Sequence, residues 1–379
     1  MQFARLSVFA ALISTSSLLY AAPQYSLTLL GPVNGHAGTF THTINNAALV
    51  SGYSDTYNPL NGGYTASNAT IWSQGIATAL SGHGTSNSQA FTSNLSGQTA
   101  GVSWNVSKEL PVQGQPFAQP DYDGKATVWS NGSATTLAGI YNAYGYASGI
   151  NNHGQVIGWS LQGRYDTVAT LWNNNSPTAL AALAGYTADA YAINDQGIIA
   201  GTAVNDSYSH TAVFWDAQNQ IHQLQGISGG MSGAYDINEQ GILTGWSTSA
   251  DNHQHATIWV DGQAVDLGRL GGYASYAYGL NNLGDVVGSY IDTSAGVYEE
   301  YALIWKNGVA SNLNSLVDLP SGITLVYAQD INDLGYIIAQ GYDTEGRFSS
   351  YLLTPVPEPS SYVLMLAGLV LMGISRRKR

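Results

Sequence analysis

Apolar and polar residues alternate in short runs along the middle of this chain, and the same order of runs recurs. One unit contains four such runs, Ala190 to Ile193, Ile198 to Ala203, Thr211 to Trp215 and Gln220 to Leu224. Alternation with a period of two indicates β-strands. Asn194 and Gly197 lie between the first two runs. An Asn-x-x-Gly sequence favours a type I turn whose Gly takes a positive φ and closes a tight hairpin.

This unit occurs seven times, as two markers show. The first marker is the turn asparagine, found at Asn45, Asn94, Asn151, Asn194, Asn238, Asn281 and Asn332. The second is a β-type run that ends in Trp72, Trp129, Trp172, Trp215, Trp259 or Trp305, with Leu353 in that place in the last unit. Repeats of roughly 40 to 50 residues with four strands each are typical of β-propeller blades.

The two ends of the repeat region complement each other. The last unit runs out after its third strand at Leu353, while the chain offers an unpartnered strand at Tyr25 to Leu30. We expect this N-terminal strand to complete the C-terminal blade, which satisfies two open edges that a linear solenoid would leave exposed. The sequence therefore predicts an all-β fold, a seven-bladed β-propeller over residues 23–355.

The units also resemble the HAF repeats of extracellular bacterial proteins, which are named for a His-Ala-Phe element before a Trp. The resemblance rests on His255-Ala256-Thr257, in which Thr replaces Phe, on the Leu-Gly-x-Leu-Gly-Gly of Leu267 to Gly272, and on Ala277 to Asn281. It implies export and repetition, and it implies no reaction.

The N-terminus has the features of a signal peptide. Arg5 precedes an apolar stretch from Leu6 to Leu19, and small residues follow at Ala21 and Ala22. This order of charge, apolar stretch and small residues is that of a segment removed by signal peptidase. We expect residues 1–22 to be cleaved, after Ala21 or Ala22.

The C-terminus indicates the destination. Pro357, Glu358 and Pro359 are followed by an uncharged run from Ser360 to Ser375 and then by the basic residues Arg376, Arg377, Lys378 and Arg379. The apolar part is about 15 residues against the ~20 that span a bilayer, so a single marginal transmembrane helix is expected. Its basic end should stay cytoplasmic.

Residues 356–379 look like the PEP-CTERM sorting tail of Gram-negative bacteria, whose family members are processed by the membrane protease exosortase. The resemblance implies passage through the inner membrane and then sorting to the cell envelope or outer surface, or secretion. A simple C-terminal anchor without processing is the alternative.

Charge and cysteine content narrow the function. The exported body has six basic and 23 acidic side chains, a formal net charge of −17. Such a surface repels nucleic acid and anionic lipid headgroups. With no cysteine, the chain has neither disulfides nor thiolate metal ligands.

Two motifs have both a chemical and a structural interpretation. Gly226 to Gly230 matches the Gly-x-Ser-x-Gly nucleophile pattern, which needs a strand, a sharp elbow and a helix. No helical pattern follows it, so we expect an inter-blade turn. His253 and His255 would share one strand face, a spacing that a transition metal could use together with Asp251. Two ligands do not make a site, and we expect surface histidines.

Two acidic segments also have both a chemical and a structural interpretation. Asp121 to Gly124 has two carboxylates and a turn glycine, a fragment of a calcium loop, and a calcium ion on so acidic a surface is possible. Glu299 and Glu300 are adjacent. Neighbours on a strand face opposite ways, so they form a poor acid/base pair. We predict no catalytic residue and no protein metal site.

Tyrosines supply the candidate ligand-binding residues. Tyr191, Tyr235 and Tyr278 recur in phase before the turn asparagine, on the strand expected to be innermost. They either pack between blades or form aromatic platforms. Another group is expected in loops between second and third strands, at the same end as the inter-blade loops: Tyr57, Tyr64, Tyr165, Tyr208 and Tyr298. Tyrosines among Asn and Asp suit sugar rings, which stack on aromatics and hydrogen-bond through their hydroxyls.

These observations predict a non-enzymatic, exported propeller whose loop-rich face binds a partner, and the PEP-CTERM resemblance together with the aromatic and polar loop residues implies an exopolysaccharide as that partner. A propeller hydrolase or lyase that acts on glycans is one alternative, and it needs acids or histidines gathered at the channel mouth. A purely structural surface protein is the other.

Overall fold

The computed structural model describes residues 24–33, 35–58, 63–82, 87–105, 124–141, 144–162, 166–183, 187–343 and 345–356. Tyr25–Pro355 form one compact unit. The predicted signal peptide and C-terminal apolar helix lie outside the described residues. Within the described ranges, no helix has the length and apolar character needed to cross a membrane.

The unit Tyr25–Pro355 consists of seven four-stranded antiparallel sheets. Blades 1 to 4 are β2 (Gly38–Ile44), β3 (Leu49–Asn58), β4 (Gly63–Ser73), β5 (Ile76–Ala79); β6 (Asn87–Ser93), β7 (Thr99–Trp104), β8 (Lys125–Ser130), β9 (Ser133–Thr136); β10 (Gly145–Ile150), β11 (Val156–Gln162), β12 (Asp166–Asn173), β13 (Ser176–Ala179); and β14 (Ala188–Ile193), β15 (Ile199–Val204), β16 (His210–Trp215), β17 (Ile221–Gln223).

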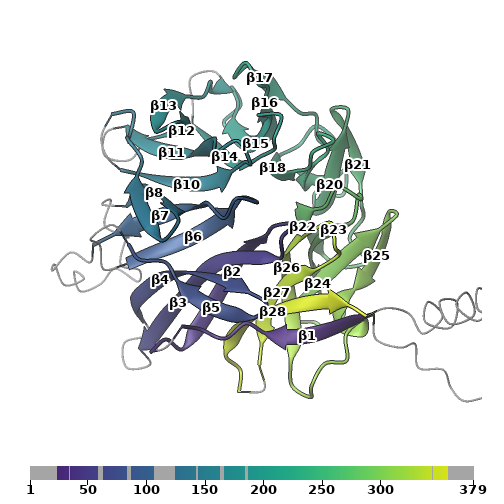
Figure 1. Cartoon of the computed structure of the whole chain (residues 1–379). Coiled ribbons are helices and arrows are strands. Elements are labelled where there is room, and N and C mark those ends of the chain that lie inside the picture. The colour runs from purple at the N-terminus through teal and green to yellow at the C-terminus, as the bar shows by residue number, and fades with distance from the viewer. Residues whose placement is uncertain are drawn as a thin grey trace, which may run out of the picture. The chain divides into compact units, whose positions relative to one another are not determined.

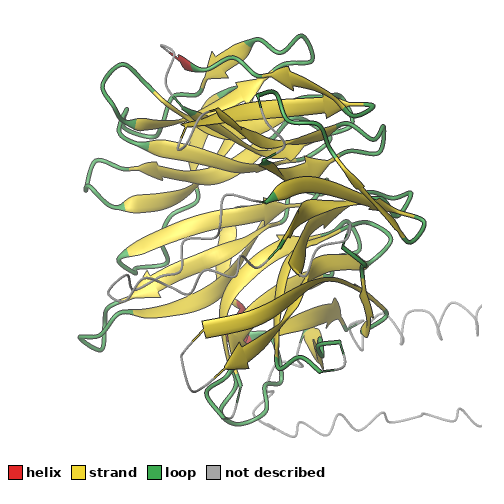
Figure 2. Cartoon of the chain, turned by 90° about the vertical axis from the view of Figure 1, so that its left-hand side faces the viewer, coloured by secondary structure: helices red, strands yellow, loops and turns green. Residues whose placement is uncertain are grey.

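Blades 5 to 7 are β18 (Ser232–Ile237), β19 (Leu243–Thr248), β20 (Gln254–Val260), β21 (Gln263–Asp266); β22 (Ala274–Leu280), β23 (Val286–Asp292), β24 (Glu299–Lys306), β25 (Val309–Asn312); and β26 (Thr324–Ile331), β27 (Ile337–Tyr342), β28 (Phe348–Pro355), β1 (Tyr25–Leu29). A short 3-10 helix, η2 (Leu313–Ser315), follows β25. Figure 1 shows the first strand of each blade around a common axis, and Figure 2 shows the blades from the side, built almost entirely of strands. The predicted seven-bladed β-propeller is confirmed.

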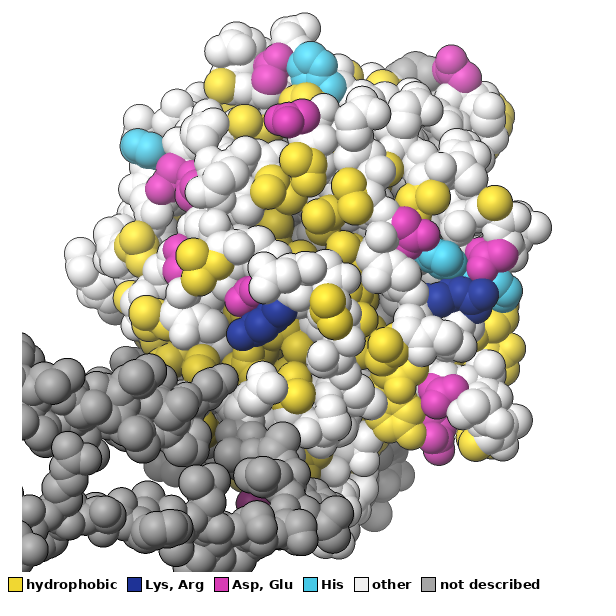
Figure 3. Space-filling model, turned by 90° about the vertical axis from the view of Figure 1, so that its right-hand side faces the viewer, with side chains coloured by type: hydrophobic (Ala, Val, Ile, Leu, Met, Phe, Trp, Pro, Cys, Tyr) yellow, Lys and Arg dark blue, Asp and Glu magenta, His cyan; other side chains and the backbone are white. Residues whose placement is uncertain are grey.

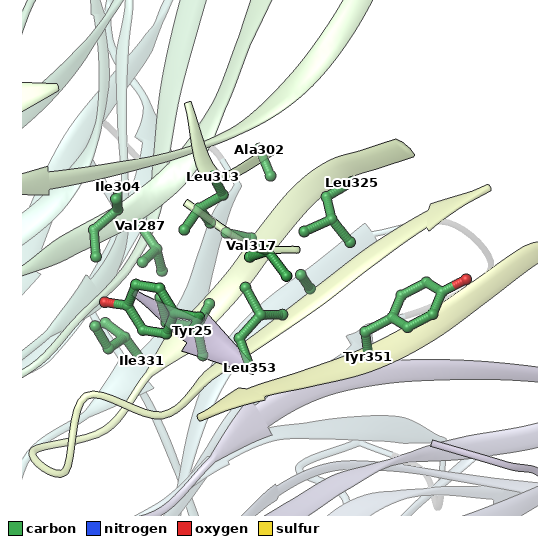
Figure 4. Packing of buried hydrophobic residues seen from close by; sticks show 13 residues of the cluster. Tyr25, Val287, Ala302, Ile304, Leu313, Val317, Leu325, Ile331, Tyr351 and Leu353 are labelled. Atoms are coloured by element: carbon green, nitrogen blue, oxygen red, sulfur yellow. The ribbon is translucent and has the colours of Figure 1, made fainter. Parts of the chain in front are cut away.

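The N-terminal strand closes the propeller as predicted. β1 pairs antiparallel with β28, with Leu27 opposite Leu353, so blade 7 takes its fourth strand from the other end of the chain. Tyr25 is buried, and its backbone N–H donates to the carbonyl of Leu316, 3.2 Å away. Figure 4 shows Tyr25 and Leu353 packed with Val317 and Ile331 in the same apolar cluster. The closure is therefore secured by side-chain packing as well as by the strand ladder.

The repeated tryptophans are the largest fully buried side chains of the described chain. Each indole Nε1–H donates to a backbone carbonyl in the connection that precedes its blade: Trp72 to Gly31, Trp129 to Ser81, Trp172 to Ala138, Trp215 to Ala181, Trp259 to Gln225 and Trp305 to Leu267. A buried indole needs such a partner. In blade 7 the buried Leu353 takes this place without a hydrogen bond, and the paired β1 holds that blade instead.

Candidate functional site

The topology sorts the connections into two ends of the propeller. The turns between first and second strands all lie at one end, which we call the Asn-turn end. The loops between second and third strands lie at the other, together with the inter-blade connections, and we call this the loop end. The predicted clustering of these two kinds of loop follows directly from the antiparallel order of each sheet.

The turn asparagines form a closed circle of hydrogen bonds at the Asn-turn end. Each side-chain amide donates to the backbone carbonyl of the equivalent asparagine in the next blade, at 3.0 to 3.1 Å: Asn45 to Asn94, Asn94 to Asn151, Asn151 to Asn194, Asn194 to Asn238, Asn238 to Asn281, Asn281 to Asn332, and Asn332 back to Asn45. We call this the asparagine circle. It joins all seven blades through one repeated side chain.

The same side chains also hold their own turns. The Asn238 side-chain oxygen accepts the backbone N–H groups of Gln240 and Ile242, at 3.1 and 3.0 Å. Gly241 has a φ of +75°, as the predicted type I turn requires. Each asparagine therefore uses its oxygen within the blade and its nitrogen between blades, which explains why this residue type recurs.

A second circle follows the residue after each turn asparagine. The backbone N–H of this residue donates to the side chain of its equivalent in the next blade: Leu95 to Asn152, Asn152 to Asp195, Asp195 to Glu239, Glu239 to Asn282, Asn282 to Asp333, and Asp333 to Asn46. We call this the rim circle. Leu95 has no side-chain acceptor, so the circle is interrupted between Asn46 and Leu95.

A cavity of about 220 Å³ lies inside these circles, at the mouth of the channel, and we call it the vestibule. All seven blades contribute to its wall. Tyr191 and Ser148, three positions before their turn asparagines, lie deeper along the inner strands than the rim residues Asp195, Glu239 and Asp333.

Asp236 and Asp330 project into the vestibule from β18 and β26. Each side chain accepts the backbone N–H of its own neighbour and one from the next blade: Asp236 from Leu280 at 3.1 Å, and Asp330 from Ile44 at 2.8 Å. Gly279 lies in the blade between them, and a Cβ there would come within 2.8 Å of Asp330 Oδ1, so a glycine leaves room for this carboxyl.

Both carboxyls are held in an unfavourable environment for charge. Burial raises the pKa of Asp236 to about 6. Burial, together with the charge of Asp236, raises the pKa of Asp330 well above its usual range.

An exposed aromatic cluster lies at the loop end of blades 5 and 6. The Tyr273 ring contacts the His253 ring edge to face, with centroids 4.3 Å apart, and contacts the Tyr298 ring in the same way at 5.5 Å. Tyr298 is 72% exposed and Tyr273 39% exposed. We call Tyr273, Tyr298 and His253 the aromatic platform. The sequence singled out Tyr298 and His253 separately, and Tyr273, which joins them, was missed.

Charged side chains flank the platform and neutralise one another. His255 Nδ1 lies 2.9 Å from Asp266 Oδ2, and Arg269 lies 2.9 Å from Asp251. The prediction of surface histidines is wrong for His255, which is buried because Asp266 at Nδ1 and Asp251 at Nε2 give its ring nitrogens polar partners. The basic side chains visible in Figure 3 likewise lie next to acidic ones. No group of three metal-ligating side chains occurs among the described residues.

The other predicted loop tyrosines that the structure describes belong to blades 1 and 4, away from the blades that carry the platform. Tyr57 and Tyr64 were expected in a loop, but they pair with each other in β3 and β4, because their β-favouring neighbours extend the hairpin ladder. Tyr208 is at the tip of the β15–β16 turn, 75% exposed, with a φ of +57° where the inner turns carry glycine. Tyr165 lies outside the described residues.

Tyr191, Tyr235 and Tyr278 are on the innermost strands as predicted, where a bulge interrupts each ladder. Tyr235 contacts both of the others across blade boundaries, with ring centroids 5.7 and 6.1 Å apart. They belong to a chain of ring contacts through all seven blades: Trp159, Tyr146, Phe91, His42, Tyr53, Phe40, Phe348, Tyr327, Tyr278, Tyr235 and Tyr191. Of the two interpretations offered for these tyrosines, packing between blades agrees with these ring contacts.

Glu300 is an acid whose position the sequence did not reveal. Ser289 Oγ donates to Glu300 Oε1 over 2.6 Å and lies 3.2 Å from the Tyr278 hydroxyl. Burial and the Glu300 charge raise the pKa of Tyr327 to about 12. Glu299 is exposed and accepts a hydrogen bond from the Tyr301 hydroxyl, so the adjacent glutamates have separate partners.

The remaining motifs have structural roles or lie outside the described residues. Ser228, the serine of the Gly-x-Ser-x-Gly sequence, lies in the turn between β17 and β18, and its hydroxyl donates to the carbonyl of Thr248 at 2.7 Å. No nucleophile elbow is formed there. Asp121 and Asp123 of the calcium-like segment are not among the described residues.

Solved structures are similar to this chain in fold. A puromycin-hydrolysing peptidase from Mycobacterium tuberculosis matches with a TM-score of 0.53 and 9% identity, over 84% of this chain and 52% of the peptidase chain, about half of it. TolB from Acinetobacter baumannii matches at a TM-score of 0.43 and 12% identity, over 81% and 79% of the two chains. A Trypanosoma rangeli sialidase matches at 0.44 and 10%, over 88% and 58%. At these identities the likeness concerns the fold alone.

Sequence comparison adds one finding. No curated protein sequence matches the chain. The HAF-type resemblance stays a prediction. Residues 355–379 match the family model of the PEP-CTERM protein-sorting motif, which contains Pro357, Glu358, Pro359 and the terminal basic residues. This motif implies that the chain is exported, processed by an exosortase-type system and sorted to the cell envelope or surface.

Proposed function

We propose that this protein is a non-enzymatic surface propeller that binds a glycan, the exopolysaccharide of its own cell, through the loop end. The aromatic platform carries this proposal. Two exposed tyrosine rings and an imidazole, joined through the central Tyr273, form an apolar surface of the kind on which sugar rings stack. Export by a sorting tail would bring this surface to the polysaccharide.

The platform offers polar groups beside its aromatic faces. Asp251 and Arg269 form an ion pair next to it, so they can accept from and donate to sugar hydroxyls without presenting net charge. The Arg269 guanidinium also donates to the carbonyl of Gly272, which fixes the chain next to Tyr273. The platform therefore keeps its geometry before a ligand arrives, and this limits the entropic cost of binding.

A glycan hydrolase or lyase is the second candidate function. Glu300, held by Ser289 beside Tyr278 and near Tyr327, is the acid best placed for such chemistry. Product analysis distinguishes the two functions, since a binding protein returns its glycan intact.

The test is a glycan-array and exopolysaccharide binding measurement on the purified protein and on Tyr273→Ala, Tyr298→Ala and Tyr141→Ala. Tyr141 is 58% exposed in another inter-blade connection and is the matched control. We expect each platform variant to bind about tenfold more weakly, a loss of about 1.4 kcal/mol, and Tyr141→Ala to bind like the parent. Equal binding by all four proteins would contradict the platform, and released oligosaccharides that disappear in Glu300→Gln would favour the enzyme.

A further inference from the structure

The vestibule is a cavity with ligand-binding character, at the opposite end of the propeller from the aromatic platform. Its volume is about 220 Å³. That is room for one small ring and too little for a drug-sized molecule, whose pockets start at about 300 Å³. The cavity lies on the channel axis, so a chain end could enter it from the solvent.

The vestibule wall has a surplus of hydrogen-bond acceptors. The hydroxyls of Thr43 and Ser148 donate to the carbonyls of Phe91 and Ala190, at 3.0 and 2.7 Å, so lone pairs remain for a ligand. Each carboxylate oxygen of Asp236 and Asp330 accepts one backbone N–H and keeps capacity for another bond. The amide nitrogens of the turn asparagines donate to the carbonyls of the asparagine circle. A ligand that fits this wall must be rich in donors.

The charge of the wall points the same way. Asp195, Glu239 and Asp333 stand at the rim, Asp236 and Asp330 lie deeper, and no Lys, Arg or His is among the lining residues. Buried carboxylates without a cationic partner are costly. A positively charged group on the ligand would supply that partner.

The deep side of the vestibule provides an aromatic face. Tyr191 lines the cavity and is 39% exposed. An aromatic face beside carboxylates suits a sugar ring, whose C–H face stacks while its hydroxyls donate. The ligand must therefore carry many hydrogen-bond donors, a positive charge and one small ring. An amino sugar without an acetyl group has all three properties.

We propose that the vestibule binds one unacetylated amino-sugar residue, whose ammonium and hydroxyl groups donate to Asp236 and Asp330 while its ring lies against Tyr191. This site is independent of the aromatic platform. Either site can exist without the other, because they lie at opposite ends of the propeller.

The test is calorimetric titration of the purified protein with glucosamine, N-acetylglucosamine, glucose and calcium chloride at about pH 7.5. The variants are Asp236→Asn/Asp330→Asn and, as a matched control for loss of acid, Asp206→Asn, an exposed residue at the loop end. Tyr273→Ala separates this site from the platform. Thermal unfolding of every variant confirms that it is folded before titration.

We expect glucosamine to bind at least tenfold more tightly than N-acetylglucosamine or glucose. The affinity for glucosamine should fall at least tenfold in the double variant and stay unchanged in Asp206→Asn and Tyr273→Ala. Affinity should also fall as the pH is lowered through about 6, where Asp236 takes up a proton. Other charged or titratable groups near the vestibule contribute to this pH dependence. They are Glu239, whose pKa is raised by burial, and its neighbours Asp195, Asp333 and His153. Unchanged binding in the double variant, equal binding of the acetylated sugar, or binding of calcium in place of glucosamine would each overturn the proposal.

Discussion

The two ends of this propeller are built from the same blades but follow different rules. At the Asn-turn end one residue type occupies the same position in every blade, and its side chain closes a circle of hydrogen bonds. At the loop end the connections differ in length and sequence, and the contacts of the platform occur in blades 5 and 6. Repetition therefore serves closure of the fold, and departure from repetition identifies where a partner can be recognised.

The vestibule shows the same contrast on a smaller scale. Two positions before the turn asparagine, most blades carry small or neutral residues such as Thr43, Gly149 and Ala192, whereas blades 5 and 7 carry Asp236 and Asp330. Both exceptions point into the one axial cavity. Each carboxyl accepts a backbone N–H from the next blade, but a neutral acceptor would do the same without the cost of a buried charge. The two acids therefore fit the proposed binding site better than a role in folding alone.

The largest expected effect breaks the asparagine circle. Asn238→Ala removes two turn bonds and one inter-blade bond at a buried position, and we expect a loss of about 2–4 kcal/mol because buried N–H groups lose their acceptor. Asn205→Ala is the matched control, since Asn205 makes the same two turn bonds at the loop end and, among the described residues, no inter-blade bond. It should cost about 1 kcal/mol. Urea unfolding of both variants measures the difference, and equal losses would contradict a special role for the circle.

The next effect concerns pH. Burial raises the pKa of Asp236 to about 6 and also raises that of Asp330, so between about pH 4 and pH 6 these two carboxyls bind more protons in the folded chain than in the unfolded chain. Their contribution to the free energy of unfolding should therefore fall as the pH rises through this range.

The double variant Asp236→Asn/Asp330→Asn isolates this contribution. Because asparagine does not titrate, the free energy of unfolding of the double variant minus that of the parent should rise by on the order of 1–3 kcal/mol from about pH 4 to pH 7. Exposed acids with lowered pKa, such as Asp216 and Asp343, act in the opposite direction in both proteins and cancel in the difference. Urea unfolding at several pH values provides the data, and parallel pH profiles would argue against the buried pair.

A smaller effect tests the gap in the rim circle. Leu95 interrupts this circle and is 54% exposed. Leu95→Asn should supply the acceptor for the Asn46 N–H and stabilise the fold by about 0.5–1.5 kcal/mol. Leu95→Ala, which removes the same apolar side chain without adding an acceptor, is the control. A thermal midpoint no higher for Asn than for Ala would show that the interruption has no energetic meaning.

The smallest effect sharpens the comparison at the loop end. Tyr208 has a φ of +57°, a conformation that glycine adopts without steric cost. Tyr208→Gly should therefore raise stability slightly or leave it unchanged, within about 1 kcal/mol, whereas Gly241→Tyr, which creates the same geometry at the Asn-turn end, should destabilise by about 1 kcal/mol or more. Differential scanning calorimetry compares them. A clear loss of stability in Tyr208→Gly would mean that the Tyr208 side chain packs usefully.

The sequence by itself determined the local and repetitive features of this protein. Asn-x-x-Gly turns, alternating strands and the spacing of Asn and Trp predicted seven blades, and the lone strand at Tyr25 predicted the closure with Leu353. These features depend on residues within a few positions, or on a register that repetition makes visible. The sorting motif is likewise a contiguous string of residues, and a family model recognises it directly.

Only the tertiary structure decided which residues meet. The partner of each turn asparagine is 43 to 57 residues away, or 287 where the propeller closes, and no local pattern encodes that contact. Asp236 and Asp330 become neighbours in one cavity, and Tyr273 meets Tyr298, because seven separate blades converge on one axis and fold their connections to two ends. The sequence predicted ligand-binding residues among the loop tyrosines. The vestibule at the other end forms only when the seven blades assemble around one axis.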